Sequence, residues 1–231
     1  MTVAISDGRG NSQNATTLEG GYFRIVNVRP GTYTASAQTG YGTSNPATFD
    51  VMPNRVANVN LIVPTAIDLK YSALGGGGGL LGQPLTNELL APDGVGHFRH
   101  FQNGSIYWTP QTGAWEVQGA IRDKWASFGW ERSFLGYPLT DESGTPDGVG
   151  RFNHFQGGSI YWTPQTGPHE VHGAIRDYWA SLGWERSSLG YPITDEMPIQ
   201  GSNGRYNQFQ VCFIYWYPNT GAYGYCPPRI N

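Results

Sequence analysis

The sequence predicts a mainly β protein: an N-terminal antiparallel β-sandwich, followed by a tandem-repeat domain of β-hairpins and short helices. Three observations support this prediction. The 231 residues include 33 glycines and 14% aromatic residues, a composition typical of short strands joined by tight turns. From Leu81 onward, the same motifs return with a period of 54 residues. Residues 1–66 contain no tryptophan and alternate strand-like runs with turns.

Residues 1–66 are expected to form the sandwich, which we interpret as a spacer. The chain enters a strand pattern directly at Met1, without a visible signal peptide, which fits either a cytoplasmic protein or a piece of a longer exported chain. Further strands are predicted over 22–26, 32–37, 48–51 and 56–63, with a Pro-Gly turn at 29–32. The runs 7–10, 16–23 and 28–33 resemble carboxypeptidase-regulatory-like domains. That resemblance implies a transthyretin-like fold in a secreted protein.

Residues 67–79 are predicted to be a glycine-rich linker. Gly75 to Gly79 are five consecutive glycines, which pay a high entropic cost in regular structure. We therefore expect a flexible joint between the sandwich and the repeats.

Three repeats follow within residues 80–231, at 81–134, 135–188 and 189–231. The first two are identical at 40 of 54 positions. Each is expected to run from a Pro-Asp-Gly turn into a hairpin and then a short helix, where Val117, Ile121, Trp125 and Phe128 follow helical spacing. The third copy lacks this helix after its hairpin and is interpreted as a modified cap. Such small units bury a core only by packing on one another.

The recurring motifs resemble LGFP repeats. They are Leu-Gly-Gln/Tyr-Pro, Pro-Asp-Gly-Val-Gly, Gly-Ser-Ile-Tyr-Trp-Thr-Pro and Gly-Ala-Ile-Arg-Asp, at constant offsets. The resemblance covers residues 80–222. It implies a secreted or cell-wall location, a propeller-like arrangement, and attachment of a host protein to cell-wall polysaccharide such as arabinogalactan.

The repeated aromatic residues are the first candidates for glycan binding. Adjacent strand residues point to opposite faces, so one member of each Tyr-Trp pair should enter the core and the other should face solvent or the next repeat. Exposed rings stack well on the C–H faces of sugars. The candidates are Tyr107, Trp108, Trp115, Tyr161 and Trp162. Core packing between repeats is the alternative role for each of them.

Carboxylates are the second group of candidates. Asp93 and Asp147 could accept hydrogen bonds from sugar hydroxyls, although Asp before Gly also suits a turn. The pairs Asp141-Glu142 and Asp195-Glu196 have the residue types of a glycosidase site. Because the pair recurs and adjacent side chains point apart, we predict that the protein is not an enzyme.

Other chemistry has little support in the sequence. A net charge of −3 without a basic patch argues against nucleic-acid binding, and no apolar run is long enough to insert into a membrane. No metal-ligand spacing appears, and we predict neither a metal nor another cofactor. Cys212 and Cys226 either form a disulfide, which would favour an oxidising compartment, or remain two free thiols.

The function predicted from these observations is a non-catalytic module that attaches a secreted protein to cell-envelope polysaccharide. A structural or adhesion array without glycan binding is the first alternative, and a cell-wall hydrolase is the second. A partial array also leaves open surfaces, so self-association with another chain is a further expectation.

Overall fold

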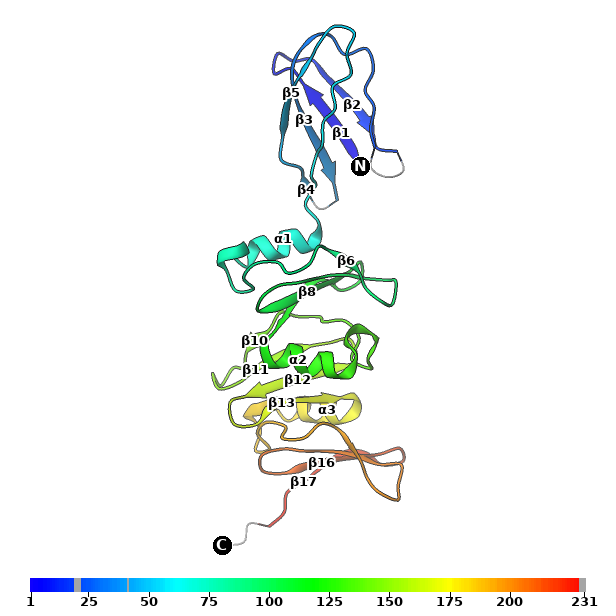
Figure 1. Cartoon of the computed structure of the whole chain (residues 1–231). Helices are drawn as coiled ribbons and strands as arrows, with labels where there is room; N and C mark the ends of the chain where they lie inside the picture. Colours follow the sequence, from blue (N-terminus) through cyan, green and yellow to red (C-terminus); the bar gives the residue numbers. More distant parts are fainter. Residues whose placement is uncertain (19–21, 41, 229–231) are drawn as a thin grey trace. The chain divides into compact units, whose positions relative to one another are not determined.

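The computed structural model describes residues 1–18, 22–40 and 42–228, and it confirms a mainly β protein (Figure 1). The chain forms two compact parts, Met1–Leu69 and Lys70–Asn231. The division falls inside a helix, α1 (Ala66–Ala73). Among the described residues, no helix has the length and apolar character needed to cross a membrane.

The described residues of the N-terminal part form one five-stranded antiparallel sheet instead of the two packed sheets of the predicted sandwich. Its central strands are β1 (Thr2–Ser6) and β3 (Gly31–Thr39). Strand β2 (Ser12–Thr16) pairs with β1, while β4 (Gly42–Thr43) and β5 (Ala47–Val51) pair with different stretches of β3. Alternate residues of the central strands are buried, which gives the sheet one core-facing side.

Two of the predicted N-terminal strands are not formed. The predicted strands 32–37 and 48–51 fall within β3 and β5, but 22–26 and 56–63 contain no strand. Ile25, Val59 and Leu61 from these segments still pack against the core around Tyr33, as does the nearby Val28. Their alternating apolar pattern therefore reflects burial against the sheet rather than ladder hydrogen bonding. Part of the 16–23 motif lies outside the described residues.

The C-terminal part contains three units, each built from a helix, a 3-10 helix and a four-stranded antiparallel sheet with its strands in sequence order. We number them unit 1 (70–118), unit 2 (119–172) and unit 3 (173–226). Unit 1 takes in the second half of α1, then η2 (Gly76–Gly78), β6 (Leu89–Leu90), β7 (His97–His100), β8 (Gly104–Thr109) and β9 (Gly113–Gln118).

Units 2 and 3 repeat this order. Unit 2 contains α2 (Gly119–Phe128), η3 (Trp130–Arg132), β10 (Ser143–Gly144), β11 (Arg151–His154), β12 (Gly158–Thr163) and β13 (Gly167–His172). Unit 3 contains α3 (Gly173–Ser181), η4 (Trp184–Arg186), β14 (Met197–Pro198), β15 (Arg205–Gln208), β16 (Phe213–Tyr217) and β17 (Gly221–Tyr225).

The helix follows each of the first two hairpins in the chain, as predicted, but it packs on the next sheet as well, so we number each unit from its helix onward. Val117, expected on a helix, lies on the fourth strand of its sheet, and the helix starts only at Gly119. With this order, the third unit has its helix, α3, in front of its sheet. All three units are therefore complete in the described chain.

The predicted flexible linker is also wrong. Gly76–Gly78 form η2, at the position that η3 and η4 occupy in the other units. Gly75 and Gly76 have φ angles of 92° and 58°, and the equivalent Gly129 and Trp130 have 104° and 59°. The backbone path is the same, so the glycines accommodate left-handed geometry that a tryptophan adopts in units 2 and 3.

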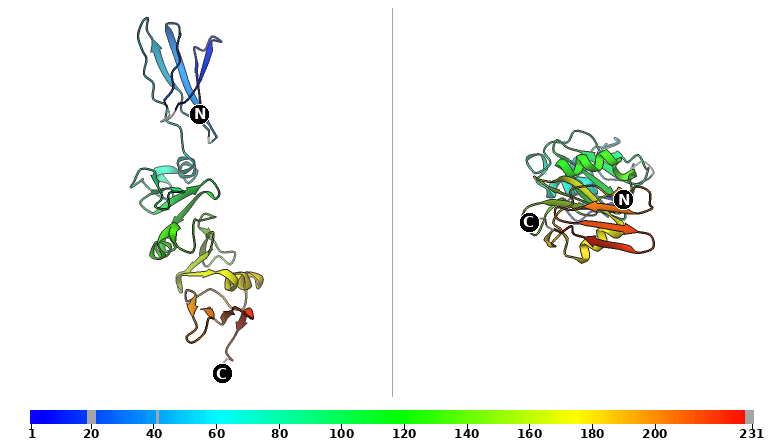
Figure 2. Two further views of the ribbon diagram at one scale, coloured as in Figure 1. Left: turned by 90° about the vertical axis from the view of Figure 1, so that its right-hand side faces the viewer. Right: turned by 90° about the horizontal axis from the view of Figure 1, so that it is seen from below.

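The units stack because each new helix packs between two sheets. Helix α2 contacts β8 and β9 of unit 1 as well as β12 and β13 of its own unit, and α3 repeats this between units 2 and 3. Trp125 on α2 is fully buried, with its ring 4.7 Å from that of Tyr107 and 5.2 Å from that of Phe155. Units 1 and 3 lie at opposite ends of an open stack, so the described units do not form the propeller-like arrangement that the resemblance implied (Figures 1 and 2).

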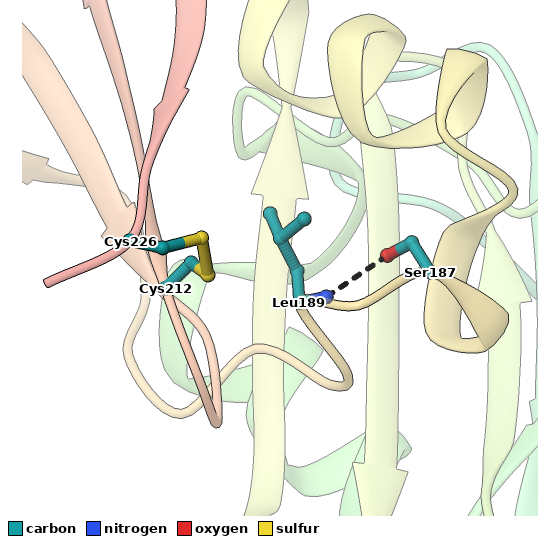
Figure 3. The surroundings of a disulfide bond; sticks show 4 residues. All are labelled: Ser187, Leu189, Cys212 and Cys226. Atoms are coloured by element: carbon teal, nitrogen blue, oxygen red, sulfur yellow. Dashed lines mark hydrogen bonds between the residues drawn. A yellow bond between two sulfur atoms is a disulfide. The ribbon is translucent and has the colours of Figure 1, made fainter. Parts of the chain in front are cut away.

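A disulfide joins Cys212 to Cys226, as one of the two sequence-based alternatives predicted. In unit 2 the last residue pair of the equivalent strands is Gly158 opposite His172, and the next helix follows at once. In unit 3 the two cysteines hold these positions, next to the buried Leu189 (Figure 3). The disulfide therefore links the end of β17 to the start of β16, at the point where units 1 and 2 continue into the next helix.

Candidate functional site

The Tyr-Trp pairs place their tyrosines in the core. Tyr107 and Tyr161 are 2% and 3% exposed, and each packs edge-on against the buried tryptophan of the following helix. Neither ring is accessible to a polysaccharide. As predicted from strand alternation, the partners Trp108 and Trp162 lie on the other face, where both are partly exposed.

Each of these outward tryptophans belongs to a recurring set of three side chains, here called the Glu-cation-Trp triad. The cation position holds an arginine in units 2 and 3 and, in unit 1, a histidine that is charged only when protonated. It lies directly across the ladder from the tryptophan, and a glutamate from the preceding loop contacts it. Sequence reasoning did not combine these residues, although their offsets repeat. The three triads are Glu88-His97-Trp108, Glu142-Arg151-Trp162 and Glu196-Arg205-Trp216.

The triads combine a ring face with paired charges. His97 Nδ1 lies 3.0 Å from Glu88 Oε1, and Arg205 Nε lies 3.3 Å from Glu196 Oε1. Arg151 Nε donates a hydrogen bond to Glu142. The side chain of Arg151 is half exposed, while that of Glu142 is almost buried. An exposed guanidinium beside an accessible indole can bond to sugar hydroxyls while the indole covers a sugar face.

Burial changes the acidity of two triad glutamates. It raises the pKa of Glu142, although the hydrogen bond and charge of Arg151 oppose this effect. It likewise raises the pKa of Glu196, opposed by the charges of His172 and Arg205. The arginines thus favour the ionised carboxylates that accept their hydrogen bonds.

The second triad also faces a groove at the junction of units 1 and 2. Its volume is about 550 Å³, and one wall carries Glu142, Arg151 and Trp162. The turn residues Gln102 and Asn103 of unit 1 and the start of α2 also line it. This groove can accommodate a small ligand with many hydroxyl groups, because its lining joins one aromatic side chain to several polar ones.

Asp93 and Asp147 accept hydrogen bonds across the two junctions between units. Tyr137 of unit 2 donates its phenol hydrogen to the Asp93 carboxylate of unit 1 at 2.8 Å, and it accepts the Gly96 N–H at 3.1 Å. Tyr191 bonds to Asp147 in the same way at the next junction. These carboxylates stabilise a turn and a junction between units, which argues against the prediction that they accept hydrogen bonds from sugar hydroxyls.

We expect Tyr137→Phe to lower the free energy of unfolding by about 2 kcal/mol, because a hydrogen bond to a carboxylate contributes about 1.5–3 kcal/mol. Urea unfolding followed by tryptophan fluorescence measures this loss. Tyr22→Phe, at an exposed position in the N-terminal part, is the control and should change nothing. A Tyr137→Phe protein as stable as the parent would show that this hydrogen bond does not hold the junction.

The adjacent carboxylates 141–142 and 195–196 also serve the junctions. Asp141 forms an ion pair with Lys70 and accepts the Glu116 N–H at 3.0 Å. Glu116 in turn accepts the Glu142 N–H at 2.9 Å. Lys124, Asp195 and Glu170 form the same contacts one unit later.

The outer ends of the stack lack the residues that form these contacts. Unit 1 has no unit before it, and it carries Gln83 and Asn87 where the later units have the junction tyrosine and aspartate. In unit 3, Tyr178 and Gly201 stand where the earlier units have the junction lysine and aspartate. The differences among the repeats therefore follow the presence or absence of a neighbouring unit.

Glu116 gives the first junction a pH dependence. Burial, with Glu142 and Asp141 nearby, raises its pKa to about 7, against an ordinary value of 4.5. Between these values the unfolded chain is ionised while the folded protein still binds the proton. Stability should therefore fall as pH rises from about 4.5 to 7, by at most about 3 kcal/mol.

Glu116→Gln should remove this fall, so the variant should melt above the parent at pH 8 and match it near pH 4.5. Thermal melts across this range provide the measurement. Glu170→Gln is the matched control: His172 Nδ1 lies 2.8 Å from Glu170 Oε2, so this substitution removes a charge partner. That control should be destabilised at pH 6. A parent-minus-variant difference independent of pH would contradict the role of Glu116.

The remaining candidate, Trp115, lies under a lysine. The Lys70 ammonium group is 4.9 Å from the centre of its ring, and its indole N–H donates to Thr112 O. This ring is only partly exposed, and unit 2 has His169 in its place. It belongs to the contacts around Asp141 rather than to a repeated surface.

Sequence reasoning missed a histidine-serine-arginine cluster at each junction. Ser105 Oγ lies 2.7 Å from both His100 Nδ1 and Arg122 Nε. Ser105 is fully buried, and burial followed by the Arg122 charge lowers the pKa of His100. A buried hydroxyl held by arginine cannot reach a substrate, so the cluster joins α2 to the sheet of unit 1. Among the described residues, no group of acidic, histidine or cysteine side chains is arranged to hold a metal.

Comparison with known families agrees with the stacked units. The LGFP repeat model matches residues 81–133, 135–187 and 189–225, which is more than half of the chain. No curated protein matches the sequence. Each match starts at a Leu-Gly segment and ends before the next, so it joins the sheet of one unit to the helix of the following unit. The chain belongs to the LGFP-repeat family.

Proposed function

We propose that the protein is a non-catalytic binding module that attaches a secreted protein to cell-envelope polysaccharide through its Glu-cation-Trp triads. LGFP repeats occur in cell-envelope proteins, and a disulfide is compatible with an oxidising compartment outside the cytoplasm. In this proposal, the N-terminal part acts as the spacer that its carboxypeptidase-regulatory-like motifs imply. The glycan is arabinogalactan-like.

The recurrence of the triad is the observation that carries the proposal. The same three positions hold a glutamate, an arginine or histidine, and a partly exposed tryptophan in every unit. Trp162 and Trp216 also pack against the cores of their junctions, so packing explains part of this recurrence. The Glu-Arg pair beside each of these partly exposed indoles is not needed to fill a core. Three weak sites on one rigid stack would bind a repetitive polymer with an avidity far above that of one site.

The carboxylate pairs support binding rather than catalysis. Asp141 and Asp195 pair with lysines of the preceding unit, and the neighbouring Glu142 and Glu196 pair with the triad arginines. Burial raises the pKa of both glutamates, but within each pair the two carboxylates bind different cations, whereas a glycosidase needs two carboxyl groups facing one glycosidic bond. The hydrolase alternative would require product release from a wall substrate that is lost in Glu142→Gln.

Co-sedimentation with isolated arabinogalactan-containing cell walls tests this function. Trp162→Ala should lower the retained fraction several-fold, and replacing Trp108, Trp162 and Trp216 together should abolish retention, because avidity depends on the number of sites. Trp115→His is the matched control: it removes a partly exposed indole outside the triads and installs the residue that unit 2 carries. It should bind like the parent.

Failure of the folded parent protein to sediment with the walls at low salt would contradict the proposal. Equal retention of the parent and the triple variant would show that the triads are not the contact surface. Thermal melts of each variant confirm that any loss of binding occurs in a folded protein.

A further inference from the structure

The outer face of the last sheet is aromatic. Alternate residues of β15, β16 and β17 point to this face, and their cross-strand register brings them side by side. We call this surface the tyrosine face. Its members are Tyr206, Phe213, Tyr215, Tyr217, Tyr223 and Tyr225.

In the preceding units, the equivalent face is covered by the next helix. There Tyr107 and Val117 are buried against α2, at 2% and 0% exposure. The equivalent residues of unit 3 are Tyr215 and Tyr225. The described residues after β17, 226–228, form no helix, and Tyr223 and Tyr225 are 43% and 51% exposed.

The tyrosine face differs from the equivalent face of unit 2 in its side chains as well as in its exposure. Where unit 2 has Ser159, Thr163 and Val171, unit 3 has Phe213, Tyr217 and Tyr225. A sheet face that met only solvent would carry charged or small polar residues at these positions. Instead, three further rings have been added to an open surface.

One of these tyrosines has a structural explanation. In units 1 and 2, the tyrosine of the next unit packs over a turn glycine, as Tyr137 does over Gly96. In unit 3 the ring of Tyr217 lies over Gly204, so it fills the place of the missing neighbour. The remaining tyrosines of the face fill no such place.

The geometry of the rings suits a flat ligand with many hydroxyl groups. The Tyr217 and Tyr223 rings are inclined by 11° with centres 6.4 Å apart, and those of Phe213 and Tyr215 by 20° at 5.9 Å. Within the described part of the chain, none of the five phenol hydroxyls on this face hydrogen-bonds to the protein. By contrast, Tyr71 and Tyr137 donate theirs to Gly82 O and Asp93.

We propose that the tyrosine face is a second binding site, which takes an uncharged polysaccharide by stacking sugar rings on Tyr223 and Tyr225 and bonding sugar hydroxyls to the phenols. The face carries no charged side chain, unlike the triads, so it offers an anionic polymer no counter-charge. The helix that covers the equivalent face of unit 1 packs on Val117 and hydrogen-bonds to Ser105 through Arg122, whereas the much larger Tyr225 and Phe213 occupy these two positions in unit 3. The site deepens the proposed function, on which it rests, by adding a surface selective for neutral glycan.

Affinity electrophoresis of the full chain in gels containing soluble larch arabinogalactan tests this site. Tyr223→Ser combined with Tyr225→Ser should weaken retardation at least tenfold, and Tyr22→Ser, at an exposed tyrosine of the N-terminal part, should not. Polygalacturonate, an anionic polymer, should retard the parent and the double variant equally. Because both residues are substantially exposed, the double variant should melt close to the parent.

The outcomes separate this site from the triads. If Trp162→Ala weakens retardation but the double tyrosine variant matches the parent, the tyrosine face is not a glycan site and the proposed function stands. If only the tyrosine variant loses binding, the face is the glycan site and the triads are not. A parent that is not retarded contradicts both proposals. Sedimentation that shows a dimer of the parent and a monomer of the double tyrosine variant would make this face a self-association surface instead.

Discussion

Replacing Trp179 by alanine is expected to lower the free energy of unfolding by about 3–5 kcal/mol, the largest loss we predict for a single residue. Its ring is fully buried between units 2 and 3, 4.7 Å from the ring of Tyr161 and 5.2 Å from that of Phe209. The cavity would lie where one sheet meets the next, so the substitution removes contacts on both sides. Urea unfolding followed by fluorescence reports on this part, because all eight tryptophans lie in it.

Two variants calibrate this result. Trp179→Tyr introduces the residue that α1 carries at the equivalent position, Tyr71, and should cost clearly less than alanine. Trp216→Ala removes a tryptophan that is only partly buried, and should likewise cost less. A loss below about 1.5 kcal/mol for Trp179→Ala would show that the units do not depend on the shared helix for their stability.

Removing the disulfide should cost about 3 kcal/mol, the second-largest effect. Cys212 and Cys226 are 14 residues apart, and a cross-link that closes a loop of about 15 residues stabilises by about 3 kcal/mol in the chain-entropy model. The structural context adds to this expectation, because the bond holds β17 to β16 where no following helix covers the sheet.

The replacement of both cysteines by serine, compared with the oxidised parent in urea, measures this effect. The reduced parent should resemble the double-serine protein, and reducing agent should leave the double-serine protein unchanged. Equal stability of the oxidised parent and the double-serine protein would contradict a stabilising role for the bond at the end of the stack.

Local patterns predicted the repeating elements better than their grouping. The period, the hairpins and the alternation of Tyr and Trp all follow from rules that act within a few residues. The start of a unit does not, because Val117 fits helical spacing as well as it fits the strand it occupies. Only the packing of α2 between two sheets decides which elements belong together.

The structure of Gly75 to Gly79 also depends on more than local composition. A composition rule treats Gly75 to Gly79 as a flexible joint, whereas the backbone path there is the one that Gly129 to Ser133 follow in the next unit. Aligning the run with that segment would have revealed its structure, since Leu81-Gly82 and Leu135-Gly136 follow at the same offset.

The candidate site was only partly accessible to sequence reasoning. Strand alternation indicated that either the tyrosine or the tryptophan of each pair faces outward, but it could not choose between them. The choice follows from Trp125 and Trp179, which pack on the tyrosine side. The partners of Asp93 and Asp147 lie 44 residues further along the chain, a separation that local motifs do not reveal.

The central claim, that the outward tryptophans contact envelope polysaccharide, is tested most directly by nuclear magnetic resonance. Each of the eight indole N–H groups gives its own signal, which single Trp→Phe variants can assign. On titration with soluble arabinogalactan, the signals of Trp108, Trp162 and Trp216 should shift or broaden, while those of the buried Trp125 and Trp179 stay in place. A titration that leaves the three triad signals unchanged would contradict the claim.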